Sequence, residues 1–213
     1  PGTSGPVYVG AFVLTLFVLG LFIVKGPMKW CLLAATILSI LLSWGKNFMG
    51  FTDFFLDYVP MYDKFRTVAS ILVVAEFTIP LLAMLALKEL LEKPDLLPQR
   101  MKAVYISAAL TGGVALLFAL MPDVFFGNYI STMEQGMFQQ AAQAGYIPQD
   151  MIMPILSNLE DMRRAMFVSD AWRSALIVAI GLLLLIAFRM KKMNATMVTA
   201  SLIVLCLIDM WQV

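Results

Sequence analysis

The sequence predicts an all-α fold, a polytopic transmembrane helix bundle of about six spans with further helices in the outer membrane interface. Of its 213 residues, 61% are apolar and only 14% are charged, whereas soluble domains contain about 25% charged residues. The apolar residues come in runs of about 18–22, long enough to cross a hydrocarbon core of roughly 30 Å. We therefore predict one transmembrane domain over residues 1–213.

The first three predicted spans cover residues 7–24, 30–45 and 67–87. The first is an unbroken apolar run. The second is shorter, and a tryptophan near each of its ends suits the membrane interface. The third is apolar except for one glutamate, and it contains an internal proline.

The last three predicted spans cover residues 103–121, 172–188 and 195–211. The fourth contains small residues spaced four, three and four apart, which is typical of helices that pack closely in membranes. In the sixth, Asp209 lies near the outer end, and we expect it in the membrane interface.

The distribution of lysine and arginine predicts the orientation of the chain. The connections 25–29, 88–102 and 189–192 together hold nine basic side chains in 24 residues. The longer segments 46–66 and 122–171 have a several-fold lower density of basic residues. Because basic loops stay in the cytoplasm, we expect these two longer segments to be outer loops, and the outer face to carry the function.

The outer segment 122–171 has a composition that predicts helices rather than disorder. Ser131 and Glu134 have the spacing of a capping box at a helix start. A second helix is expected after it, with an interruption at Pro154. Ser169 or Asp170 would then cap the start of the fifth span.

The overall composition limits the chemistry that the chain can perform. The formal net charge is +1 and there is no histidine, so we expect no nucleic-acid partner and no histidine-based metal site or catalytic triad. We expect Cys31 and Cys206 to be buried free thiols. The sequence begins at Pro1 without a methionine or a basic leader, and we expect it to be the middle of a longer protein.

Glu76 is the most conspicuous ionisable residue in a predicted span. It lies roughly 14 Å into the third span at about 1.5 Å per residue, close to the expected midplane. Pro80 cannot donate a hydrogen bond to the carbonyl of residue 76, and Ala69 and Ala83 share its face, which favours packing against protein. Glu76 is either a site for a substrate, an ion or a proton or a neutral acid that joins helices.

The outer segment 46–66 interleaves acids, bases and tyrosines with apolar residues, a pattern that suits an interfacial helix. Arg66 lies where the third span begins, and its guanidinium could bind the phosphate of a lipid-linked substrate. Alternatively, Lys64 and Arg66 pair with headgroups or nearby aspartates. The outer acids could also hold a divalent metal, although their spacing does not require one.

A second charged cluster lies at the outer mouth of the fifth span and contains Arg163, Arg164, Asp170 and Arg173. From the charge pattern alone, Asp170 is a helix cap and the arginines are interfacial anchors. The sixteen methionines are expected mainly in the core or facing lipid.

An ordered set of residues lies between positions 45 and 76: Gly45, Asn47, Asp57, Tyr58, Pro60, Phe65, Arg66 and Glu76. This set resembles the YfhO family of bacterial membrane proteins, particularly members from Bacteroidetes-type bacteria. The stretches TSGPVYVG and RAMFVSDAWRSALI are also similar to that family, so the resemblance extends over most of the chain.

The resemblance implies a larger multi-pass protein of the bacterial inner (cytoplasmic) membrane, related to GT-C-type glycosyltransferases. Such a protein would transfer a sugar from a polyprenyl-phosphate carrier to a cell-envelope polymer on the outer face. The catalytic carboxylate is expected upstream of Pro1. The resemblance and the charge pattern together give these candidate substrate-binding residues: Asp57, Tyr58, Tyr62, Lys64, Arg66, Glu76 and Arg173.

Two alternatives belong to other functional classes. A transporter or flippase would use Glu76 and the break at Pro80 as a midplane site, as broken helices do in transporters. A non-catalytic envelope assembly factor would tolerate replacement of Lys64, Arg66 and Glu76.

Overall fold

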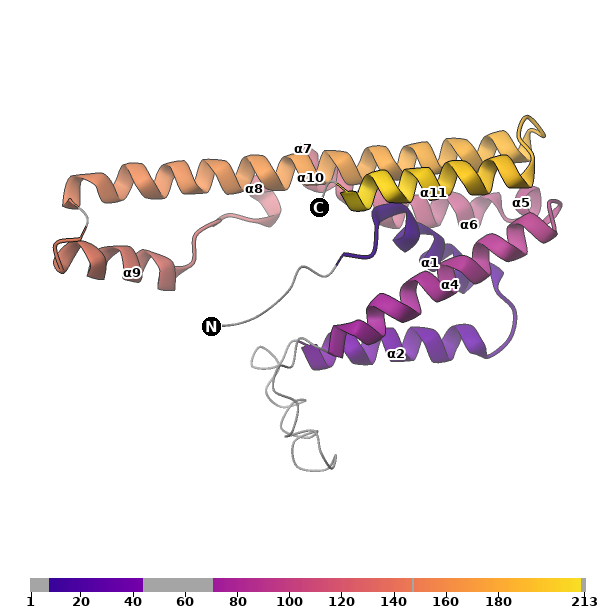
Figure 1. Cartoon of the computed structure of the whole chain (residues 1–213), viewed down its shortest axis with the longest axis horizontal. Coiled ribbons are helices and arrows are strands. Elements are labelled where there is room, and N and C mark those ends of the chain that lie inside the picture. The colour runs from indigo at the N-terminus through magenta and orange to yellow at the C-terminus, as the bar shows by residue number, and fades with distance from the viewer. Residues whose placement is uncertain (1–7, 44–70, 147, 212–213) are drawn as a thin grey trace, which may run out of the picture. The chain divides into compact units, whose positions relative to one another are not determined.

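The computed structural model describes residues 8–43, 71–146 and 148–211, and every regular element in these ranges is a helix (Figure 1). The all-α prediction is therefore confirmed for the described part of the chain. Contacts between Cα atoms divide the chain into two compact units. Unit 1 comprises Pro1–Thr111 with Ile177–Val213, and unit 2 comprises Gly112–Leu176.

Unit 1 contains most of the apolar helices. Its elements are α1 (Ala11–Ile23), α2 (Met28–Ser43), α4 (Leu72–Glu92), α5 (Leu96–Gln99), α6 (Met101–Ala108), the start of a π-helix (Ala109–Gly113), the end of α10 (Ile152–Arg189) and α11 (Ala195–Trp211). Helix α1 packs extensively on α4, and α2 packs on the same helix. Helix α4 is thus the central contact of this unit.

The buried side chains of α1 explain its place in the core of unit 1. Phe12, Leu16, Leu19 and Ile23 recur every three or four residues and belong to one buried cluster with residues of α10 and α11. This spacing places the four side chains on one face of the helix. Burying such a face is the main favourable term in folding a helix that has little stability alone.

Two glycines allow the helices of unit 1 to approach closely. A Cβ added to Gly20 would lie 2.9 Å from Cγ of Leu82 and 3.1 Å from the Leu82 carbonyl oxygen. A Cβ added to Gly181 would overlap the ring of Phe12. The missing side chains therefore make room for α4 against α1 and for Phe12 against α10.

Hydroxyl groups join the helices of unit 1 inside its apolar interior. The Thr15 and Thr111 side-chain oxygens are 2.8 Å apart, and those of Thr36 and Thr78 are 2.7 Å apart. Ser39 Oγ donates to the carbonyl of Ile71 over 3.0 Å. Such bonds between hydroxyls are a common way to join helices where water is absent.

Unit 2 contains α7 (Val114–Leu120), α8 (Pro122–Phe125), α9 (Thr132–Gln143), a 3₁₀ turn at Gln149–Met151 and the first part of α10. An aromatic cluster supports it. The rings of Phe118 and Phe125 are 5.1 Å apart, and those of Phe126 and Phe167 are 4.9 Å apart, both near edge-on. These geometries are the favourable ones for aromatic pairs.

The predicted capping box of α9 is confirmed. Ser131 Oγ accepts a hydrogen bond from the amide of Glu134 at 3.2 Å, and the Glu134 side chain accepts one from the amide of Ser131 at 3.1 Å. The two bonds satisfy amides that would otherwise lack partners at the helix start.

The predicted break between an outer helix and the fifth span is wrong. Helix α10 is continuous over 38 residues. Pro154 is its third residue, where the missing amide has no helical acceptor to lose. No glycine or proline comes after Pro154 until Gly181, so nothing in the sequence interrupts the helix there. Ser169 and Asp170 therefore lie in its interior and do not cap a helix start.

Two stretches in the described ranges are long and apolar enough to cross a membrane: Met101–Leu120, which runs through α6, the π-helix and α7, and Gln149–Arg189, which contains α10. The sequence predicted about six. Helices α1, α2 and α11 have 13, 16 and 17 residues, or about 20 to 26 Å at 1.5 Å per residue, short of a roughly 30 Å core. Helix α4 has 21 residues but carries four charged side chains.

Candidate functional site

The described ranges contain two of the seven candidate substrate-binding residues, Glu76 and Arg173. The other five lie outside them: Asp57, Tyr58, Tyr62, Lys64 and Arg66. The two described candidates belong to different helices, Glu76 to α4 and Arg173 to α10. Further charged groups gather in unit 2, around the first part of α10.

Glu76 is the fifth residue of α4, which begins at Leu72 and continues to Glu92. Within these bounds the midpoint is Leu82, six residues after Glu76. Residues 67–70 of the predicted span lie outside the described residues, so the expected midplane position of Glu76 stays a prediction. Its side chain is half-buried, and the predicted neighbour Ala83 on the same face is buried. The half-burial is consistent with a position at the edge of the packed face of α4.

Arg173 lies where α10 changes from a charged to an apolar sequence. Only 19% of its side chain is exposed, and Nη1 lies 3.5 Å from Oδ1 of Asp170, one turn earlier. A separation of 3.5 Å is long for a charge-assisted hydrogen bond, which is usually about 2.7–2.9 Å. Asp170 is therefore a weak partner of Arg173 and is not the predicted helix cap.

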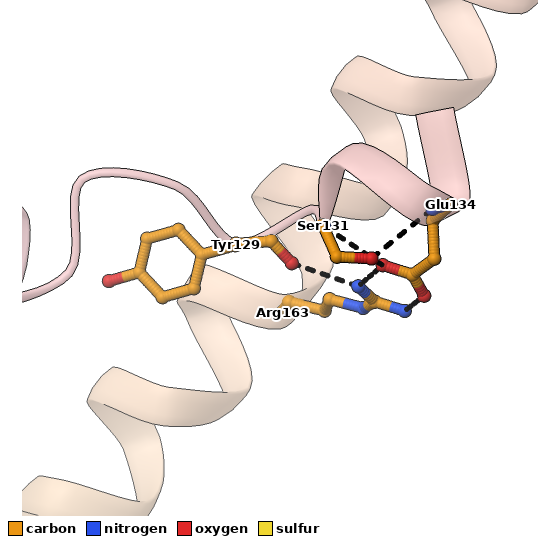
Figure 2. Close-up of polar contacts among 4 residues, drawn as sticks. All are labelled: Tyr129, Ser131, Glu134 and Arg163. Atoms are coloured by element: carbon orange, nitrogen blue, oxygen red, sulfur yellow. Dashed lines mark hydrogen bonds and ion pairs between the residues drawn. The ribbon is translucent and has the colours of Figure 1, made fainter. Parts of the chain in front are cut away.

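Arg163 joins α10 to the start of α9 (Figure 2). Its Nη1 and Nη2 atoms donate to the two carboxylate oxygens of Glu134 at 2.9 and 2.7 Å, and Nη1 also donates to the carbonyl of Tyr129 at 2.8 Å. Hydrogen bonds from Arg163, and then that from the Ser131 amide, lower the pKa of Glu134 to about 2. The paired geometry fixes both position and orientation of the two groups.

Arg164 makes a second paired contact within unit 2. Its Nε and Nη2 atoms donate to the two carboxylate oxygens of Asp123 at 2.8 and 2.6 Å. These hydrogen bonds hold the pKa of Asp123 below its usual value. Arg163 and Arg164 thus connect unit 2 internally and are not simply the interfacial anchors that the sequence suggested.

Asp209 is a buried acid with a structural role that the sequence pattern did not predict. It is 1% exposed, and its carboxylate accepts hydrogen bonds from the Tyr8 hydroxyl at 2.8 Å and the Ala11 amide at 2.9 Å. It thus caps the start of α1, where Gly10 has a φ of 90° and offers no side chain for the purpose. The available signal was an acid inside an apolar run, which is rare without a partner.

An open apolar groove lies between α1, α4 and α11 in unit 1. Its volume is about 510 Å³, and residues that line it include Phe12, Pro80, Leu202 and Cys206. The Thr199 hydroxyl in its wall already donates to the carbonyl of Ala195. The groove can therefore hold hydrocarbon but offers little to a polar ligand.

The described residues contain no group of three or more His, Cys, Asp or Glu side chains that could hold a metal ion. Cys31 and Cys206 are both free, as expected, but Cys31 is exposed and Cys206 is half-buried. The expectation that both thiols are buried is therefore wrong.

No protein-family model, no curated protein and no solved structure matches the chain. The resemblance to the YfhO family is therefore carried only by the sequence motifs, and the function is inferred from the residues themselves.

Proposed function

We propose that the chain is part of a multi-pass protein of the bacterial inner membrane that transfers a sugar from a polyprenyl-phosphate carrier to a cell-envelope polymer on the outer face. The observation that carries this proposal is the largely buried side chain of Arg173, at the start of the apolar part of α10. A phosphate attached to a membrane lipid would arrive at such a depth.

The positions of the neighbouring arginines support the choice of Arg173. Arg163 and Arg164 lie ten and nine residues earlier, in the charged part of α10, where each donates two hydrogen bonds to one carboxylate of unit 2. Arg173 lies further along α10, where the apolar sequence begins. A planar guanidinium at that position can bind phosphate oxygens in pairs.

The surface of unit 1 supports a membrane environment. Large apolar side chains are exposed on several of its helices, among them Phe77, Leu183 and Leu207. Exposed apolar surface of this extent is unfavourable in water but not in lipid. We propose that the apolar helices of unit 1 cross the membrane together with the two long stretches, giving about six spans.

Lys64 and Arg66 are proposed as further groups for the donor phosphate, and Asp57, Tyr58 and Tyr62 as groups that line the substrate cavity. These five residues rest on the sequence resemblance alone. In the proposed mechanism, the bases bind the carrier phosphate and stabilise the charge that develops on it as the glycosidic bond breaks. A carboxylate elsewhere in the longer protein takes the proton of the acceptor hydroxyl.

The proposal is tested with the full-length protein in nanodiscs and a photo-crosslinkable polyprenyl-phosphate sugar. We expect saturable labelling of the wild type, strong loss in Arg173→Gln, and partial recovery in Arg173→Lys, which restores charge but not the paired geometry. Arg189→Gln is the matched control, because Arg189 is an exposed arginine and the last residue of the same helix.

The outcomes of this experiment distinguish the role of Arg173 from the transferase proposal as a whole. Thermal unfolding of each variant in the same nanodiscs separates loss of binding from loss of fold. Unchanged labelling in a folded Arg173→Gln protein would remove Arg173 from the site. A well-folded wild type without saturable labelling would contradict the transferase proposal.

The second candidate function, a transporter, is favoured by Glu76 and Pro80 on α4. Among the described residues, Glu76 has no hydrogen-bond or ion-pair partner, and Pro80 lies inside the same helix and lines the apolar groove. Glu76→Gln keeps the size of the side chain and removes its charge. Complete loss of function with normal folding would favour a transport role, whereas a mild effect would favour a structural one.

A further inference from the structure

The sequence expectation placed the methionines mainly in the core or facing lipid. In the described ranges none of them is buried, although methionine usually fills gaps in apolar cores. The proposed outer segment 122–171 makes up most of unit 2 and has an unusual share of them. Neither packing in a core nor contact with the lipid interior accounts for exposed methionines in an outer segment.

Two pairs of exposed methionines occur at the same spacing on the two long elements of unit 2. Met133 and Met137 are 79% and 64% exposed on α9, and Met162 and Met166 are 63% and 65% exposed on α10. Residues separated by four positions lie on one helix face with Cβ atoms about 5–6 Å apart. Each pair can therefore place two thioether sulfurs next to each other.

Helix α9 runs back along the first part of α10 (Figure 1). The 3₁₀ turn that leads into α10 packs on α9, while the start of α9 is held further along α10 by the contact between Glu134 and Arg163. The two helices are thus antiparallel, and this ion pair marks the side on which they face each other.

The ion pair also fixes where the methionines lie. On α9, Met133 comes one residue before Glu134 and Met137 three residues after it. On α10, Met162 and Met166 have the same spacing from Arg163, the ion-pair partner of Glu134. At about 100° per residue, both pairs are rotated by the same angle in the same sense from the facing side. Because the helices are antiparallel, equal rotation brings both pairs to the same side of the hairpin.

We propose that Met133, Met137, Met162 and Met166 bind Cu(I). Thioether sulfur is a soft ligand that selects Cu(I) over the hard and borderline ions, and the chain contains no histidine that would favour other transition metals. The double hydrogen bond between Arg163 and Glu134 holds the two helices, and hence the two pairs, in register.

The proposal is tested by metal titration of the purified full-length protein in nanodiscs, in a Cys31→Ala/Cys206→Ala background that removes thiol ligands. Cu(I) is added against a competing Cu(I) chelator, and Ag(I) serves as a redox-stable second probe. We expect one tightly bound ion, with sulfur neighbours in X-ray absorption. We expect the affinity to be unchanged between pH 7 and pH 5, because thioethers carry no proton to lose.

The matched variants separate this site from general methionine content. Replacing the four methionines by leucine retains their size and apolar character, and we expect loss of the bound ion. Four Met→Leu changes at exposed positions outside unit 2, Met28, Met84, Met190 and Met197, should leave binding intact. Retained binding in the first variant, or equal loss in both, would overturn the proposal.

Discussion

Gly181 and Gly136 differ in the space available for the methyl group that an alanine would add. Gly181→Ala would force a methyl group into the ring of Phe12, and overpacking of this kind costs about 1–3 kcal/mol. Gly136 lies in α9 with nothing near its missing Cβ, so Gly136→Ala should stabilise by about 0.5–1 kcal/mol through helix propensity. Thermal unfolding of both variants in one detergent checks the prediction, and a similar effect of both would contradict the close contact at Phe12.

Replacing Asp209 should weaken the contact between α11 and the start of α1 more than replacing any other residue in it. Asp209→Leu would leave the Ala11 amide and the Tyr8 hydroxyl without the acceptor that they share now. An unsatisfied buried polar group costs about 1–3 kcal/mol, so we expect a clear fall in Tm. Asp209→Asn keeps one oxygen and should lose less, and Asp150→Asn, at an exposed position, should change little.

At the scale of elements, the contact that holds α9 on α10 depends on pH. The folded pKa of Glu134 is about 2, below its ordinary value of 4.5. A lowered folded pKa contributes stability above pH 4.5 that is lost as pH falls toward 2. We expect amide hydrogen exchange in α9, corrected for intrinsic rates, to accelerate over that window.

Glu134→Gln is the control for this pH effect. The variant lacks the titrating carboxylate, so exchange in α9 should already be faster at pH 7 and should change less between pH 4.5 and 2. High salt should weaken the wild-type effect, because the pair is partly exposed and screened. A pH dependence that is identical in the variant would show that another group controls the attachment of α9.

The element scale also shows which features could be predicted from the sequence. The start of α9 is encoded locally by Ser131 and Glu134, three residues apart, and this prediction was right. The continuity of α10 was missed because Ser169 and Asp170 are residue types that often begin a helix. Such residues do not interrupt a helix unless a helix-breaking residue, such as glycine or proline, lies near them. The contact of Arg163 with Glu134 spans 29 residues, and no local pattern contains it.

The contacts of Asp209 also could not be predicted from a local sequence pattern, because they join residues even further apart in the chain. Its partners Tyr8 and Ala11 are 201 and 198 residues away in sequence. From the sequence alone, an acid near the end of an apolar run is equally compatible with an interface and with a buried cap. Only the packing of α11 beside the start of α1 decides between the two.

At the scale of the whole molecule, the number of spans decides between two topologies. If only the two long stretches cross the membrane, Lys192, shortly before α11, and Trp211, its last residue, lie on the same side. If about six helices cross, they lie on opposite sides, with Lys192 in the cytoplasm. Helix α11 has 17 residues, about 26 Å at 1.5 Å per residue. Membranes adapt to such a deficit at a modest cost per ångström.

Cysteine labelling in intact cells tests this topology. In a background without Cys31 and Cys206, a membrane-impermeant maleimide should label Trp211→Cys and Tyr146→Cys before permeabilisation, and Lys192→Cys only afterwards. Both Trp211 and Tyr146 are highly exposed, so access does not limit the reaction. Labelling of Tyr146→Cys with protection of both positions flanking α11 would mean that this helix does not cross. The about six-span bundle would then be wrong, while unit 2 would still face outward and its arginines would remain accessible to an outer-leaflet phosphate.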